Sequence, residues 1–432
     1  MPFLVRFLLV SFGLPQVFAE SELAEFYFPE LASVLSKVDL DSPLLAERRE
    51  QVQEAKANQL IASSMAGIKA GFNFQGQSVQ EDRPSYEFQS HERFFSALLV
   101  RKPLFHWGAL KAEQRKSQIA SEQAELNLSV FRKQVISELR VKYLDLVLRK
   151  FQMKLAFESL KNAKKGEANC VSRLTLGLVT DLAVAEATAV RIQHEISLAD
   201  LRRTFDYEIA MFSHLTNSDE KLDCNQTSSF IELCQNHSFQ SSKPQLISKL
   251  SSAEIDRIRL QIRIEEQNLK VANSARLPKF DLVGIAYQDQ IPSVDFNDKV
   301  NRNNLIVGLE ANWSLWDSHL SKGQKESAQS RKRKYRLEVK RHLEELRMNV
   351  TNLYKELTNL TRMIELNRKL VEVAIKRYEK SLIQFDENNI TAYELDQAMI
   401  ALNQAKISRT QSVINHLKIR DRYLQMLNYA SE

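Results

Sequence analysis

Residues 343–378, LEELRMNVTNLYKELTNLTRMIELNRKLVEVAIKRY, decide the fold class of this chain. Their apolar side chains recur in alternating steps of three and four, with one beat skipped at Asn367: Leu343, Leu346, Val350, Leu353, Leu357, Leu360, Ile364, Val371, Ala374 and Tyr378. This spacing is a heptad seam, which is typical of long helices that pack as in coiled coils. It predicts one helix over residues 320–384. A cytosolic coiled coil would carry the same seam.

The chain repeats its own plan at a constant offset of 211 residues. Without a gap, this offset aligns Leu104-Phe105 with Leu315-Trp316, Lys111 with Lys322, Tyr143 with Tyr354, Leu146 with Leu357, Thr180 with Thr391 and Ala187 with Ala398. Identities are few, but one fixed offset over about eighty residues is difficult to obtain by chance. The sequence therefore predicts two copies of one unit, the first with its own long helix over residues 109–173.

A turn and a return helix follow each long helix. Gly177, within Leu176-Gly177-Leu178-Val179-Thr180, supplies left-handed turn geometry, and so does Asn388 or Asn389 before Ile390-Thr391. Thr180 and Thr391 suit the N-cap position of return helices over 181–214 and 392–429. Each copy also opens with a lead-in helix, over 43–66 and 244–276, with Pro in its first turn. Two helical hairpins are therefore expected.

Between its lead-in helix and its long helix, each copy contains two candidate strands. Apolar and polar residues alternate over 68–77 and 305–315, as in strands with one apolar face. Their partners, 94–105 and 280–288, alternate less cleanly. The polar, proline-containing segments 79–92 and 289–304 are expected to be loops. The predicted fold class is mainly α, with four strands per chain in a duplicated strand, strand and long helical hairpin unit.

The composition favours long elements in an exported protein. Among 432 residues there are only 10 Gly and 9 Pro, so few turns are available, and 26 % of the residues are charged. Residues 1–19, with Arg6 before an apolar run and the ending Val17-Phe18-Ala19, predict a secretory signal peptide, although a short anchor also fits. No later stretch contains the roughly 18 to 20 apolar residues of a membrane-spanning helix. A bilayer would have to be crossed by the strands.

The strands predict an assembly of several chains. With about ten residues and one apolar face they resemble outer-membrane barrel strands, although a soluble sandwich alternates similarly. Four strands cannot close a barrel, and an open sheet edge cannot face lipid because its backbone groups would lack partners. Two chains would give a barrel filled by side chains, whereas three chains give twelve strands and an aqueous bore. The expected assembly is a trimeric α-barrel plus a 12-stranded β-barrel.

Several short motifs, in their order and spacing, resemble the TolC-like outer-membrane efflux protein family. They are Ala275-Arg276-Leu277-Pro278 before a strand, Pro103-Leu104-Phe105 and Leu315-Trp316-Asp317 before the long helices, Gly177-Leu178-Val179-Thr180, and Asn389-Ile390-Thr391. The likeness covers residues 43–427. It implies a homotrimeric duct in the cell outer membrane with a long periplasmic extension and no cofactor. Its implied partners are a periplasmic adaptor (membrane fusion protein) and an inner-membrane pump or ABC exporter, for efflux or type I secretion.

The repeat and the resemblance together divide the chain into five segments. Residues 1–19 form the signal peptide and 20–42 an N-terminal equatorial segment. The first repeat covers 43–214, a polar equatorial linker 215–243, and the second repeat 244–432.

Family resemblance also implies acidic residues near the periplasmic tip, where they ring the entrance and favour cations. The matching positions are Glu394 and Asp396, just after the second tip turn. Three copies of each carboxylate at a narrow mouth would focus a negative potential. As acids at the start of a helix, both are also favoured by the helix dipole alone. The family's charged links between tips are not reproduced, because Ala183 and Ile390 stand at those positions, so apolar contacts or a looser mouth are both compatible with the sequence.

The remaining polar motifs predict no metal site, nucleic-acid site or catalytic site. Cys224 and Cys234 share the polar linker, where a disulfide and two free thiols both fit. With His237 they lack a fourth ligand and the usual Cys-x2-Cys spacing, so no metal is expected. The basic run 331–334 is followed by acidic residues, which favours a solvated helix face over nucleic-acid binding. No catalytic motif occurs, so an enzyme is not expected.

Two alternatives stay open at this stage. Trp107, Trp313 and Trp316, near predicted strand ends, fit an interfacial aromatic girdle and packing in the equatorial region about equally. A periplasmic coiled-coil scaffold without channel activity is the alternative to a duct, but it leaves the four strands without a purpose.

Overall fold

The computed structural model describes residues 23–83, 86–216, 252–292, 298–387 and 389–428. Its helices are α2 (Ala24–Tyr27), α3 (Pro29–Asp41), α4 (Pro43–Ser64), α5 (Ala109–Thr175), α6 (Asp181–Thr216), α8 (Ala253–Ser274), α9 (Leu320–Asp386) and α10 (Ala392–Asn428). Its strands are β1 (Lys69–Arg83), β2 (Tyr86–Phe105), β3 (Lys279–Pro292) and β4 (Lys299–Asn312). Each helix in these ranges is too short or too polar to cross a bilayer. The mainly helical fold class with four strands is confirmed.

The two long helices confirm the internal duplication. Helices α5 and α9 have 67 residues each, and the offset of 211 aligns both their first and their last residues. The same offset aligns the start of α6 with the start of α10. Both long helices run two residues beyond their predicted ends, because the turn residues continue the helical hydrogen bonding.

The chain packs as two compact units, and each unit takes segments from both repeats. The hairpin unit consists of Met1–Ala46, Val130–Ser252 and Leu343–Glu432. The sheet unit consists of Glu47–Ser129 and Ala253–His342. Each long helix contributes one part to each unit, so neither unit corresponds to a single repeat.

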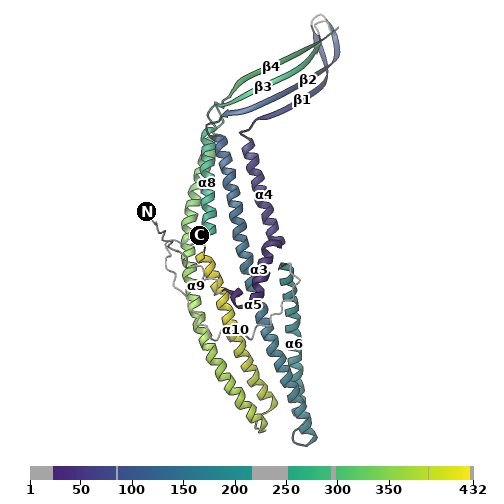
Figure 1. Cartoon of the computed structure of the whole chain (residues 1–432), viewed down its shortest axis with the longest axis vertical. Coiled ribbons are helices and arrows are strands. Elements are labelled where there is room, and N and C mark those ends of the chain that lie inside the picture. The colour runs from purple at the N-terminus through teal and green to yellow at the C-terminus, as the bar shows by residue number, and fades with distance from the viewer. Residues whose placement is uncertain (1–22, 84–85, 217–251, 293–297, 388, 429–432) are drawn as a thin grey trace, which may run out of the picture. The chain divides into compact units, whose positions relative to one another are not determined.

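The four strands form one antiparallel sheet in the order β1-β2-β3-β4 (Figure 1). Each copy contributes one hairpin, and β2 pairs with β3 to join the copies, with Leu98 opposite Ala286. The expected loops 79–92 and 289–304 are wrong, because β1 and β2 pair as far as Arg83 and Tyr86, and β3 and β4 as far as Pro292 and Lys299. Antiparallel pairing is a backbone interaction, so polar residues extend the strands without apolar alternation. Strands β1 and β4 are the sheet's two edges.

An apolar core holds the hairpin unit together. Phe28, between α2 and α3, and Leu31 of α3 join a core that contains Tyr143 of α5, Phe212 of α6 and Ile414 of α10, and all five side chains are almost completely buried. The ring centroids of Tyr143 and Phe28 lie 5.3 Å apart in an edge-to-face arrangement. Truncating a core aromatic of this kind to Ala typically costs about 3–5 kcal/mol. The segment that precedes the first repeat is therefore part of this core.

A buried polar cluster fixes the same helices. Arg140 of α5 donates from Nε to Glu25 Oε1 and from Nη1 to Asp421 Oδ1, each at 2.7 Å. Ser137 donates to the other oxygen of Asp421 at 2.6 Å. Removing one partner of a buried ion pair leaves an uncompensated charge and costs about 3–5 kcal/mol. Arg140 thereby ties α2 and α10 to the middle of α5.

Candidate functional site

The first hairpin tip ends α5 with a left-handed glycine. Gly177 has φ of 70°. Its N–H donates to the carbonyl of Leu174, and the N–H of Leu178 donates to the carbonyl of Arg173, each at 2.9 Å. This pair of bonds is a Schellman motif, which satisfies the last carbonyls of the helix. Leu178 is left exposed and Val179 half-exposed at the turn, while the carbonyl of Thr180 accepts the first bonds of α6.

The second tip starts α10 with a capping box. The N–H of Asn389 closes α9 on the carbonyl of Gln384 at 2.8 Å, and Ile390 is half-buried beside it. The N–H of Thr391 donates to Glu394 Oε2 at 2.8 Å, and the N–H of Glu394 donates to Thr391 Oγ1 at 3.2 Å. This reciprocal pattern confirms Thr391 as the N-cap. Glu394 is exposed, and one of its carboxylate oxygens is held in the cap.

The two predicted entrance carboxylates lie in different environments. Asp396 turns into the hairpin unit, where its Oδ1 lies 2.7 Å from Nε2 of His194 on α6. Both side chains are largely buried. This contact joins the two hairpins of one chain, and the sequence gives no sign of it because 202 residues separate the partners. Within one chain, Glu394 is therefore the more accessible carboxylate.

Near the tips, a small cleft of about 60 Å³ lies between the four hairpin helices. It is lined by Asn162, Ala163, Gly166, Glu167, Ala187, Val190, Tyr378, Phe385, Ala392, Leu395, Asp396 and Met399. The pKa of Glu167 is lowered, chiefly by the hydrogen bond with the Thr188 side chain and then by Arg191. Burial raises the pKa of the Tyr378 hydroxyl. The guanidinium of Arg173 stacks on the ring of Phe385 at 5.7 Å, which adds a second contact between the hairpins.

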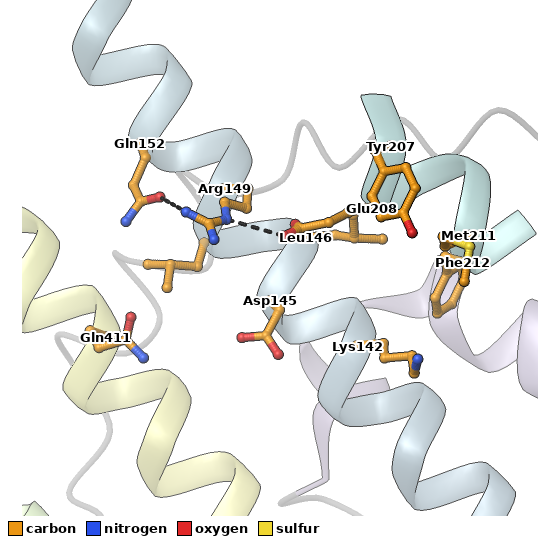
Figure 2. A pocket seen from close by; sticks show the side chains of 11 residues that line it. Lys142, Asp145, Leu146, Arg149, Gln152, Tyr207, Glu208, Met211, Phe212 and Gln411 are labelled. Atoms are coloured by element: carbon orange, nitrogen blue, oxygen red, sulfur yellow. Dashed lines mark hydrogen bonds and ion pairs between the residues drawn. The ribbon is translucent and has the colours of Figure 1, made fainter. Parts of the chain in front are cut away.

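A larger cleft of about 520 Å³ lies on the hairpin unit between α5 and α6, with Gln411 of α10 at one side (Figure 2). Arg149 crosses it to Glu208, with 3.3 Å between Nε and Oε1, and also contacts Gln152. Tyr207 and Met211 are exposed at its rim. Arg149 and Glu208, which Figure 2 shows in contact, have opposite charges and neutralise each other within the cleft.

In the sheet unit, one face of the sheet is apolar. Pleating and register place eight exposed large side chains on it: Phe72, Phe74, Phe94, Leu98, Leu282, Leu305, Val307 and Leu309. Over residues 70–80, 94–100, 280–290 and 301–311, the positions on this face contain no Lys, Arg, Asp or Glu. We call it the apolar face.

The opposite face, here named the charged face, carries two clusters of ion pairs. Arg93 makes a bidentate contact with Asp289, at 2.9 and 2.6 Å. Arg101 donates to Glu310 at 2.7 Å and lies 3.8 Å from Asp281. Leu99 and Ile306 are also exposed on this face. The two faces therefore differ in charge rather than in the presence of apolar groups.

Two of the three tryptophans anchor one turn. Nε1 of Trp107 donates to the carbonyl of Pro278 at 2.7 Å, and Nε1 of Trp313 donates to the carbonyl of Arg276 at 3.0 Å. The strand-to-helix junctions of both repeats thus converge on the turn between α8 and β3. All three indoles, including that of Trp316, stay largely exposed. Trp107 and Trp313 therefore join the turn by their N–H groups, while the rings of all three tryptophans remain exposed.

Two of the predicted sites lie outside the part of the chain that the structure describes. Cys224 and Cys234 fall in residues 217–251, and the signal peptide falls in residues 1–22. Within the described ranges, no group of three His, Cys, Asp or Glu side chains is arranged to hold a metal ion.

No protein-family model and no curated protein sequence matches the chain. Solved structures do match. CusC, studied for its transmembrane channel formation, aligns with a TM-score of 0.77 at 14 % identity, over 92 % of this chain and 91 % of that chain. CmeC, an outer-membrane channel of Campylobacter jejuni, gives 0.77 at 15 % identity, over 94 % and 87 %. VceC, an outer-membrane protein of Vibrio cholerae, gives 0.74 at 14 % identity, over 93 % and 97 %.

The chain therefore has the fold of TolC-like outer-membrane channels, along nearly its whole length. The resemblance drawn from the sequence motifs is confirmed at the level of the fold. These three proteins are described as a channel-forming protein, an outer-membrane channel and an outer-membrane protein.

Proposed function

We propose that this chain is an outer-membrane channel that works as an assembly of three copies. The observation that carries the proposal is the apolar face, where large apolar side chains are exposed and charged ones do not occur over the central rows. Exposed apolar surface of this extent marks a contact with lipid or another protein. Lipid fits best, because outer-membrane strands have an apolar outward face.

The open edges of the sheet support the number of copies. Strand β1 and strand β4 each have one neighbour within the chain. In a bilayer, the backbone groups of an unpaired edge would remain unsatisfied at several kcal/mol each, so β1 of one copy has to pair with β4 of the next. Two copies would give a barrel filled by side chains, whereas three copies give twelve strands and leave a bore. We further propose that a neighbouring copy covers the cleft rimmed by Tyr207 and Met211.

The same proposal places the hairpin unit in the periplasm and the sheet in the outer membrane. Residues 1–19 act as the export signal. An equatorial belt contains residues 20–42, which precede the first repeat (43–214), and residues 215–243, which link it to the second repeat (244–432). The hairpin tips, with Glu394 exposed beside the second turn, form the entrance. A periplasmic adaptor and an inner-membrane pump or ABC exporter dock there and supply the energy for efflux or type I secretion.

The test is the location and mass of the full-length protein after expression with its own leader. The proposal predicts that it stays in the outer-membrane fraction through salt and alkaline washes, and leaves only with detergent. Light scattering of the detergent complex should then give the mass of three chains of somewhat under 49.8 kDa. Release by a salt wash, as expected of a periplasmic scaffold, would contradict the proposal, and so would a monomer in mild detergent.

The cleft provides a matched pair of variants for the same test. Tyr207→Asp places a charge at the rim of the cleft and is expected to shift the detergent complex toward smaller species. Asp200→Asn lies two turns away on the same helix, where its carboxylate is exposed and bonded to Arg203 within α6. It should leave the mass unchanged. Equal masses for both variants would show that the cleft does not belong to the interface between copies.

A further inference from the structure

The charged face of the sheet has an uneven distribution of accessible charge. Apart from His91, its described basic side chains are Lys69, Arg93, Arg101, Lys279 and Arg302, and its described acidic ones are Glu81, Asp281, Asp289 and Glu310. Within the paired rows of the four strands, five positive charges against four negative ones leave one excess positive charge. The apolar face has no comparable set over its central rows, so the excess belongs to one side of the sheet.

Two of the acidic side chains are more buried than the arginines beside them, which makes the accessible charge of this face more positive. The Asp289 side chain is 8 % exposed under Arg93, whose side chain is 40 % exposed. Asp281 is 13 % exposed beside Arg101, which is 42 % exposed. Asp289 thus lies beneath a guanidinium group, while Asp281 contacts Nε2 of His106 at 2.7 Å and lies farther from Arg101. At Asp289, water or a solute that approaches this face therefore meets the guanidinium of Arg93 first, whereas Glu310 and Glu81 stay about as exposed as the arginines.

The densest positive site lies around Asp289. Arg93 holds its two oxygens in a bidentate contact, and Arg302 stands directly opposite it across the β3–β4 ladder. Arg302 is exposed. Two guanidiniums therefore share one covered carboxylate, and the more accessible of the pair points to the same side of the sheet as the rest of the set.

Resting on the proposed trimeric channel, we infer that the charged face is the wall of the bore, and that Arg302 with Arg93 makes the sheet part of the channel prefer anions. Closing the sheet with its apolar face toward lipid turns the charged face inward. Three copies then form a ring of guanidiniums inside a wall of low dielectric constant, where fixed charges act on passing ions far more strongly than in open water. This filter is separate from the acidic entrance at Glu394.

The test is ion selectivity in planar bilayers, measured as the chloride-to-potassium permeability ratio under a KCl gradient. Arg302→Gln removes an exposed charge and leaves the Arg93–Asp289 pair intact, and it should lower the ratio by about twofold. Glu310→Gln, on the same face, should raise the ratio. Lys299→Gln is the matched control, because Lys299 lies three residues from Arg302 on the same strand but on the opposite face. It should leave the ratio unchanged.

The permeability ratios distinguish failure of the charged-face inference from failure of the channel proposal. Conducting channels whose permeability ratio is the same in wild type, Arg302→Gln and Glu310→Gln would overturn this inference while leaving the channel proposal standing. A shift in Lys299→Gln equal to that in Arg302→Gln would also overturn it, since the charged face would then have no special access to the bore. Absence of conductance from a folded wild-type trimer would overturn both proposals.

Discussion

Arginine at Val307 distinguishes a lipid-facing sheet from a sheet in water. Val307 is 68 % exposed at the centre of the apolar face, and Gly284 stands opposite it. In water, an Arg at such an exposed site would change the free energy of unfolding by no more than about 0.5 kcal/mol. On the lipid face of a barrel near the midplane, Arg costs about 2–4 kcal/mol per chain. Ile306, 52 % exposed on the charged face of the same strand, provides the control.

The assay is urea unfolding of the protein in phospholipid vesicles, followed by tryptophan fluorescence and by the shift in gel mobility. Val307→Arg should lose about 2–4 kcal/mol per chain, and Ile306→Arg less than about 1 kcal/mol because its side chain would enter the aqueous bore. If the two variants lose equal stability, the two faces do not contact different solvents. The assignment of the apolar face to lipid would then be refuted.

Three further predictions concern the hairpin unit and the strand-to-helix junctions. Burial lowers the pKa of His416 to about 4, so the unfolded state takes up the proton first as the pH falls below about 6.5. When the pH is lowered from 7.5 to 4.5, the free energy of unfolding of the wild type, measured with urea, should therefore decrease by about 2–3 kcal/mol. His416→Leu should remove most of that loss. Gly108 has φ of 80° and open space where a Cβ would lie, so Gly108→Ala should lower the free energy of unfolding by about 1–2 kcal/mol through backbone strain alone. His319 has φ of 67°, which glycine adopts without this strain, so His319→Gly should raise the thermal unfolding midpoint. Thr391→Ala removes the cap of α10 and should cost about 1 kcal/mol in chemical unfolding; no change would mean that the capping box contributes nothing.

The long elements could be predicted because their signals are repeated many times. The heptad seam of α9 extends over many turns, and the constant offset transfers the assignment to α5, whose own pattern is weaker. The tip turns were also readable, since Gly177 and Thr391 are residue types that those backbone positions favour. The strand ends could not be predicted because strand pairing at positions such as Gln80 opposite Ser90 needs no apolar side chain.

Contacts between distant helices could not be read from the sequence. The His194–Asp396 contact depends on the rotation of α6 relative to α10, which no local pattern records. The left-handed residues before the two long helices could be predicted in one copy only. Trp107 and Gly108 both have positive φ before α5, and the offset aligns them with Ser318 and His319, which have positive φ before α9. The first copy has a glycine there and the second does not, so only one of the two junctions could be recognised from residue type.

Single-channel recording of the detergent-extracted trimer in a planar bilayer tests whether the protein conducts ions, comparing wild type, Glu394→Gln and Thr391→Ala. Gln keeps the capping box because it can also accept the Thr391 N–H, so Glu394→Gln removes charge without removing the cap. Thr391→Ala removes the cap and keeps the charge. All three proteins should give discrete conductance steps, and only Glu394→Gln should weaken the cation preference of the entrance. No steps from verified, folded wild-type protein would contradict the channel itself.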